Sequence, residues 1–182
     1  MPPWEENVPE TVPETMPETM KTTPPDTLQR FRDLRLRALQ DAPDAFGATS
    51  EASVDRDAAY WRGWITGEGW DGEVRSWVAE DRGTWRAMAV GARFDASPTV
   101  VHLFGMWVEP ALRGSGIASR LVGTVTAWAI ARGAERLRLA VSDGNDRAET
   151  FYAKRGFVRT GEDATPLREG STVLVHAMER VL

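Results

Sequence analysis

The sequence has no cysteine and only two histidines, His102 and His176. Without thiols the chain can form no disulfide, thiolate nucleophile or thiolate metal site, and two histidines are too few for a histidine-rich metal cluster. We therefore predict no metal cofactor. The sequence also lacks an apolar run near the length of about 18 residues that a membrane span needs, and a basic then apolar leader at its start. These absences favour a cytoplasmic protein that works away from the membrane.

Basic residues are too few for a nucleic-acid binder. The 182 residues include 22 Lys and Arg against 27 Asp and Glu, which gives a formal charge of −5. An acidic chain of this kind lacks the basic patch with which proteins hold phosphate backbones. Much of the acidity belongs to residues 1–25, which hold five glutamates and one lysine. The rest of the chain is nearly neutral, so the net charge says little about a substrate.

The N-terminal segment differs in composition from the remainder. Residues 1–25 hold 7 of the 11 prolines and repeat Pro-Glu-Thr with a four-residue period. Proline at this density removes backbone donors and favours extended structure, so we predict that residues 1–22 form a disordered tail. A partner-docking role for the tail and a short strand over 19–23 are the alternatives. Residues 23–182 have the length of one domain with a single core.

Hydrophobic periodicity predicts a mixed α and β domain. Helical spacing is found at about 24–40, 53–65, 115–132 and 148–155, and strand-like alternation at about 74–80, 84–94, 99–108, 136–141, 157–161 and 172–180. The sequence Asp81-Arg82-Gly83 indicates a hairpin. Strands precede and follow the central helix, which favours an α+β fold, an α/β mixed sheet with helices on both faces.

A predicted strand ends at Val108 and runs through a glycine-containing loop into the helix at 115–132. The first amides of a helix have no intrahelical acceptor and the helix dipole favours negative charge there, while Gly114 and Gly116 let an anion approach the backbone. The sequence therefore predicts a site for a diphosphate. The loop lacks the Lys-Ser/Thr of a P-loop, and no Gly-x-Gly-x-x-Gly follows a strand, which disfavours NTPases and Rossmann dehydrogenases. A glycine-rich helix start without a ligand is the alternative.

A second motif follows this loop. Asn145 lies 29 residues after Gly116 and is followed by Phe151-Tyr152 and Gly156-Phe157. With the Arg-x-x-Gly-x-Ala pattern at Arg113, these motifs resemble the GNAT superfamily of acyl-CoA-dependent N-acetyltransferases, most specifically over residues 99–158. The resemblance implies a central, mostly antiparallel GNAT-like sheet flanked by helices on both faces, with residues 23–182 forming a single N-acetyltransferase domain.

The resemblance implies that acetyl-CoA is the co-substrate. The backbone of the strand end, at Met106, Trp107 and Val108, would pair with the pantetheine arm, and Asn145 would hydrogen-bond the same arm. Backbone amides of the following loop and helix start would bind the CoA pyrophosphate. The residues concerned are Arg113, Gly114, Ser115, Gly116, Ile117, Ala118 and Ser119.

Tyr152 occupies the position from which many family members protonate the departing CoA thiolate, and a phenol suits that task. The mechanism that the resemblance implies is direct transfer through a ternary complex: a neutral amine attacks the thioester and strand-edge N–H groups stabilise the oxyanion. No covalent enzyme intermediate is required, which suits a chain without cysteine. A partly buried aromatic with a purely structural role is the alternative for Tyr152.

An alkyl ammonium must lose a proton before it attacks, so a base is needed, directly or through water. His102 is the leading candidate, because it shares strand parity with Phe104 and Met106 and some family members place a catalytic histidine on this strand. A core histidine is the competing interpretation, and Glu109 is the other candidate base. We interpret His176 as structural.

The acceptor is less constrained by the sequence. The aromatic residues Tyr60, Trp61, Trp64 and Trp70 either line its pocket or pack in the core. We predict a primary amine of a small molecule, with a protein N-terminus or lysine as the rival and a non-catalytic acyl-CoA sensor as the other class. Nucleic acid is not expected as a partner, and a homodimer is compatible with each alternative.

Overall fold

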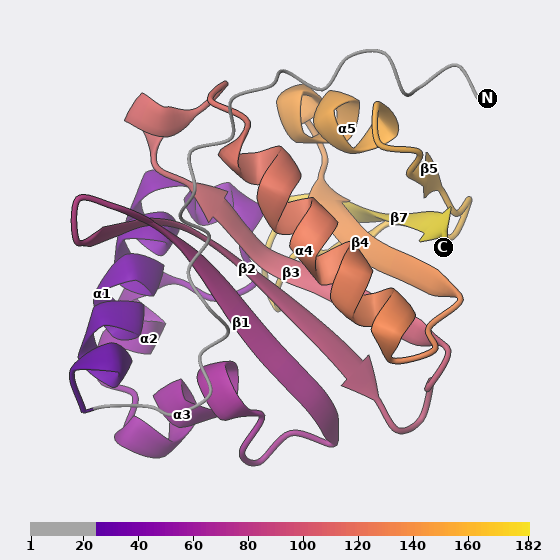
Figure 1. Cartoon of the computed structure of the whole chain (residues 1–182). Helices are drawn as coiled ribbons and strands as arrows, with labels where there is room; N and C mark the ends of the chain where they lie inside the picture. The colour runs from indigo at the N-terminus through magenta and orange to yellow at the C-terminus, as the bar shows by residue number, and fades with distance from the viewer. Residues whose placement is uncertain (1–24) are drawn as a thin grey trace.

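A sheet carries the fold in the residues that the structure describes, 25–182 (Figure 1, a computed structural model). Its strands are β1 (Gly72–Asp81), β2 (Thr84–Phe94), β3 (Val100–Val108), β4 (Arg136–Ser142), β5 (Val158–Arg159), β6 (Thr165–Pro166) and β7 (Leu174–Val181). They pair in the order β1-β2-β3-β4-β7-β5, with β6 also pairing β7. Only β3 and β4 are parallel among these described pairs. The predicted mixed, mostly antiparallel sheet is confirmed.

Helices cover both faces of this sheet, as predicted (Figure 1). One face carries α1 (Pro25–Asp41), α2 (Ser50–Val54) and α3 (Ala58–Thr66), and the other carries α4 (Ile117–Ala131) and α5 (Asp146–Ala153). Two short 3₁₀ turns, η1 (Pro43–Ala45) and η2 (Pro110–Leu112), follow α1 and β3. Each face has its own core: Phe31, Leu34 and Trp61 are buried on the first, and Leu121 and Val125 on the second.

The turn between β1 and β2 confirms the predicted hairpin. Its two loop residues both have positive φ, +48° at Arg82 and +78° at Gly83. Two-residue loops with this backbone match the right-handed twist of antiparallel strands. The turn sets Asp81 opposite Thr84, and a register shift between Ala79 and Glu80 precedes the long ladder that ends with Gly72 opposite Phe94.

Two predicted helix bounds were wrong for local reasons. The helix predicted at 53–65 is divided into α2 and α3, because the side chain of Asp57 accepts a hydrogen bond from Tyr60 N at 2.9 Å and starts a new helix. The helix predicted at 115–132 begins at Ile117, since Gly116 before it takes a left-handed φ of +85°. These changes leave the order of the large elements as predicted.

The C-terminal strands also differ from the prediction. The strand expected at 157–161 is only the two-residue β5, and β6 had no sequence signal because two residues are too few for a period. The strand expected at 172–180 is β7, and the helix expected at 148–155 is α5, which Asn145 caps. The predicted tail at 1–22 and the strand considered at 19–23 lie outside the described residues.

The pairing of β3 with β4 ends part-way along both strands. Their register runs only from Val100 opposite Arg136 to His102 opposite Arg138, whereas β4 pairs β7 along its whole length. On the other side of β3, the register with β2 shifts beside Gly105, which has a φ of +62°. This bulge and the early end of the ladder separate the second half of β3 from β4. The gap in pairing positions the candidate site.

Candidate functional site

Three cavities meet where β3 and β4 separate. The first, here the loop cavity, lies beside the loop before α4 and has a volume of about 470 Å³. The second, the central cavity of about 360 Å³, shares Met106, Asn145 and Tyr152 with the first. The third, the aromatic cavity of about 580 Å³, shares Trp64 and Phe104 with the second. The three cavities therefore lie next to one another along the second half of β3.

The loop cavity is formed by the glycine-containing loop and the start of α4. Gly114 and Gly116 have φ values of +82° and +85°, a conformation that favours glycine. Most of the predicted anion-binding residues line this cavity: Arg113, Gly114, Gly116, Ala118 and Ser119. Ser115 instead donates its hydroxyl to Leu112 O at 2.6 Å, and Ile117 packs against the core. The arrangement presents unpaired helix amides to a cavity, which suits a phosphate group.

The side chains of Arg113 and Trp107 have a structural role in this loop. Arg113 donates to Val108 O at 3.0 Å and pairs with Asp41 at the end of α1. The indole of Trp107 donates to the same carboxylate at 2.9 Å. These two predicted residues line the loop cavity, and Asp41 holds their side chains. Sequence reasoning missed Asp41, because its partners are 66 and 72 residues away along the chain.

Asn145 and Tyr152 lie where the loop and central cavities join, and both line each cavity. The side-chain oxygen of Asn145 caps α5 by accepting from Ala148 N at 3.2 Å, which leaves its amide donor for a ligand. Tyr152 is 7% exposed and packs edge-on against Phe151 and Phe157. Burial raises the pKa of the Tyr152 phenol, and the nearby charge of Arg155 opposes that shift. Tyr152 is therefore protonated at neutral pH.

His102 lies on the wall of the aromatic cavity, with its ring 5.4 Å from that of Phe94. Burial lowers the pKa of His102, the charge of Arg138 lowers it further, and Glu179 opposes both. The imidazole is therefore neutral at neutral pH, as a base must be. His102 lines the aromatic cavity, whereas Tyr152 lines the loop and central cavities, so the structure does not bring these two predicted residues to one cavity.

Glu109, the other candidate base, is held by ion pairs. It accepts from Arg86 at 2.9 and 3.0 Å and from Arg37 at 3.4 Å. Both of its carboxylate oxygens are thereby occupied by guanidinium groups, which favours a structural role for Glu109. His176, which we interpret as structural, lies on β7 with its Nε2 3.4 Å from a carboxylate oxygen of Asp143.

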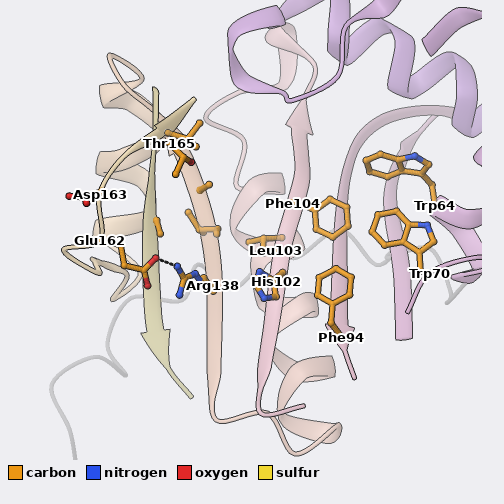
Figure 2. A pocket seen from close by; sticks show the side chains of 14 residues that line it. Trp64, Trp70, Phe94, His102, Leu103, Phe104, Arg138, Glu162, Asp163 and Thr165 are labelled. Atoms are coloured by element: carbon orange, nitrogen blue, oxygen red, sulfur yellow. Dashed lines mark hydrogen bonds and ion pairs between the residues drawn. The ribbon is translucent and has the colours of Figure 1, made fainter. Parts of the chain in front are cut away.

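Figure 2 shows the aromatic cavity, with Trp64, Trp70, Phe104 and Phe94 along one side. The ring of Trp70 stacks on Phe94 and Phe104, with interplanar angles of 14° and 21°. The opposite side carries the ion pair between Arg138 and Glu162 (Figure 2). The aromatic residues around α3 therefore have both roles considered for them: Trp61 is core, whereas Trp64 and Trp70 pack and also line a cavity.

This combination of a splayed sheet, a glycine-rich helix start and adjacent cavities agrees with a comparison of the sequence with known families. Residues 31–157 match the family model described as the acetyltransferase (GNAT) family. The chain belongs to the GNAT family. The predicted resemblance is thereby confirmed.

Other GNAT proteins resemble this chain in part or in fold. The thialysine N-epsilon-acetyltransferase of Bos taurus is 39% identical over 56 residues, which are 31% of this chain and 33% of that protein. The chain thus spans about a third of the length of that curated relative. An aminoglycoside 6'-N-acetyltransferase, solved in complex with coenzyme A, superposes with a TM-score of 0.65 at 16% identity over 90% of this chain and 94% of its own. A ribosomal-protein-alanine N-acetyltransferase from Brucella melitensis superposes with a TM-score of 0.70 at 18% identity, over 88% and 97% of the chains.

Residues 25–182 contain neither a candidate membrane-spanning helix nor a candidate metal cluster. No helix in this range combines the length and the apolar character of a membrane span. Within the same range, no three histidine, aspartate or glutamate side chains gather in a group suited to a metal ion.

Proposed function

We propose that the protein is an N-acetyltransferase that moves the acetyl group of acetyl-CoA to the primary amine of a small molecule, by direct transfer in a ternary complex. The position of Tyr152 is the main support, because this buried phenol lies where the loop cavity meets the central cavity. The loop cavity suits the diphosphate of CoA, and the central and aromatic cavities suit an acceptor. The fold shared with a CoA-bound acetyltransferase agrees with acetyl-CoA as the co-substrate. A cytoplasmic location is part of this proposal.

In this mechanism the chain orients two substrates and moves two protons. Amides at the start of α4 hold the pyrophosphate, and the edge of β3 at Met106 to Val108 aligns the pantetheine arm with Asn145. The neutral amine attacks the thioester carbon, and backbone N–H groups near the Gly105 bulge stabilise the developing oxyanion. Tyr152 gives its proton to the leaving sulfur, and His102 accepts the proton of the amine through water.

The deciding experiment is to incubate the protein with acetyl-CoA and a panel of amines and to follow thiol release. The panel includes amino acids, polyamines, aminoglycosides and peptides with free N-termini or lysines. Selective release with small amines supports the proposal. Selective release with peptides favours the protein acceptor instead, an alternative suggested by the fold shared with a ribosomal-protein-alanine acetyltransferase. Binding of CoA without turnover of any amine would leave the sensor function.

Substituting Gly116 tests the pyrophosphate site. Gly116→Ala should raise the Kd for CoA by about tenfold, because a side chain opposes both the left-handed backbone and the close approach of phosphate. Gly133→Ala is a matched control, since Gly133 has a φ of +72° at the other end of α4 and open space around its added Cβ. Calorimetric titration with CoA measures both. Equal losses of affinity in the two variants would assign the effect to helix strain alone.

The pKa of His102 predicts a pH dependence. Because burial and Arg138 lower this pKa below the ordinary value of 6.5, kcat should stay level as the pH falls through 6.5 and decline only under more acidic conditions. His102→Gln should remove that acidic limb and lower kcat by roughly tenfold, less than for a base in direct contact. Profiles of kcat from pH 5 to 9 on both proteins provide the measurement. An acidic limb that persists in His102→Gln would exclude His102 as the base.

A further inference from the structure

The guanidinium of Arg35 is buried without a counter-charge. Arg35 lies on α1, is 4% exposed and forms no ion pair with any residue from 27 to 182, and its Nη1 has no hydrogen-bond partner there. Its Cζ lies 4.3 Å from the ring centre of Phe46 and 4.8 Å from that of Trp64. The two rings stabilise the cation through cation–π contacts but offer no oxygen atom to accept its hydrogen bonds. A buried nitrogen in this state lacks the hydrogen bond that such groups normally have.

Other arginines of the domain show that this arrangement is unusual. Arg86 and Arg93 also have one buried nitrogen without a partner, but each reaches a carboxylate with another nitrogen, Arg86 at Glu109 and Arg93 at Glu73. Burial lowers the pKa of Arg35 to about 10, with a smaller opposing effect of Tyr60. The group therefore stays a cation at neutral pH, in surroundings that disfavour charge.

Arg35 lies at the cavity in which we propose that the transfer occurs. It lines the central cavity, as do Tyr152 and the bulge residue Gly105. Of the described residues around this cavity, Arg35 carries the only formal charge. An anion in the central cavity would give Arg35 a counter-charge and would lie beside Tyr152. Trp64, against which the guanidinium packs, also lines the aromatic cavity, so a ligand on Arg35 can extend there.

We propose that Arg35 binds a carboxylate of the acceptor, so that the acceptor is an amino acid or another amine that carries a carboxylate close to its amine. This inference rests on the proposed function and narrows it. A guanidinium fork matches a carboxylate with two parallel hydrogen bonds, and these are strong where water is excluded. The apolar part of such a substrate would lie along Trp64 toward Trp70 and Phe104. A peptide N-terminus has an amide in place of this carboxylate and would leave Arg35 unpaired.

The test compares amines that differ only by the carboxylate: phenylalanine with phenethylamine, and leucine with isoamylamine. The wild-type protein should show a kcat/KM at least tenfold higher for the amino acid of each pair, mostly through KM. Arg35→Met keeps the stem between the rings and should abolish that preference, so that kcat/KM becomes equal for the two members of each pair. Arg30→Met is the matched control, because Arg30 stacks on Trp85 from the same helix but pairs with Glu80 on the surface. It should keep the preference.

Several results would overturn the assignment. They are a wild-type protein that uses both members of each pair equally, a preference that survives in Arg35→Met, and a preference lost equally in Arg30→Met. The carboxylate could instead belong to the acyl group, so succinyl-CoA is compared with acetyl-CoA. If the protein prefers succinyl-CoA and this preference depends on Arg35, the carboxylate that Arg35 binds belongs to the acyl donor and not to the acceptor. If Arg35→Met does not fold, Arg35→Lys replaces it and should lower the preference in part, because it keeps the charge without the fork.

Binding separates this inference from the proposed function. Titration of phenylalanine and phenethylamine into the complex with CoA requires no turnover. Tighter binding of phenylalanine that is lost in Arg35→Met supports the carboxylate site even if no amine is acetylated, in which case only the proposed activity fails. Equal binding of the two ligands together with normal turnover overturns the carboxylate site and leaves the activity in place.

Discussion

Replacing Tyr152 with phenylalanine should lower kcat by roughly 10²-fold or more and leave the affinity for CoA nearly unchanged. The substitution removes the one proton donor proposed for the leaving sulfur and keeps the ring that packs against Phe151 and Phe157. Since burial raises the pKa of this phenol, the wild-type rate should also show no basic limb from Tyr152 up to about pH 10. Steady-state rates with a saturating amine, with CoA titrations alongside, measure the effect.

Tyr60 provides the control for this substitution, because the chain has only two tyrosines. Tyr60 lies on α3, half-buried, with its ring 5.0 Å from that of Trp61. Tyr60→Phe removes the same atom and should leave kcat within about twofold of the wild-type value. Unchanged turnover in Tyr152→Phe would end the assignment of Tyr152 as the acid, and an equal loss in both variants would point to a general effect on the fold.

Gly72→Ala should reduce the free energy of unfolding by roughly 3 kcal/mol or more, the largest stability loss that we expect from a single methyl group. Gly72 starts β1 with a φ of +139°, a conformation open to glycine, and an added Cβ would lie 2.3 Å from Arg93 O and 2.8 Å from Phe94 Cα. Both obstacles are backbone atoms of the paired strand, so they cannot rotate away. Urea unfolding followed by tryptophan fluorescence gives the difference.

Gly69→Ala separates backbone strain from this clash. Gly69 lies in the same loop with a φ of +79°, and an added Cβ there meets nothing within 4 Å. Its cost should be about 1 kcal/mol, from backbone conformation alone. Similar losses in the two variants would mean that the β1 and β2 strands can separate locally without a large cost. Gly72 also lies close to the proposed acceptor cavity. It is two residues after Trp70 and pairs with Phe94, and the rings of Trp70 and Phe94 stack on each other.

Sequence reasoning was most successful where the cause of a structure is local. The hairpin at Arg82 and Gly83 and the helix start after Gly116 depend on glycine and its neighbours, and both are present at or within two residues of the predicted place. The division of the 53–65 helix was missed, because an aspartate inside an amphipathic pattern is an N-cap only when the chain turns before it. The two-residue β6 offered no pattern to detect.

The site residues divide in the same way. Tyr152 and Asn145 were found through a motif, and the structure places both where two cavities join. Asp41 was missed, and Arg35 was not recognised as a site residue. Asp41 accepts hydrogen bonds from Trp107 and Arg113, which come from a distant part of the chain. The role proposed for Arg35 rests on a nitrogen that has no hydrogen-bond partner among residues 27–182. Composition and spacing cannot report which oxygen lies opposite a side chain once the elements pack, so such residues become visible only in three dimensions.

The short ladder between β3 and β4 divides the sheet into two halves, β1 to β3 and β4 to β7. Three residue pairs join these halves. Beyond the pair of His102 with Arg138, β3 and β4 form no further ladder pairs with each other. Backbone groups at such strand edges can bind an extended chain. A pantetheine arm lying there would act as an eighth, non-peptide strand that completes the sheet. Occupancy and folding are then linked by mass action, and the protein should gain rigidity across its middle whenever its substrate is bound.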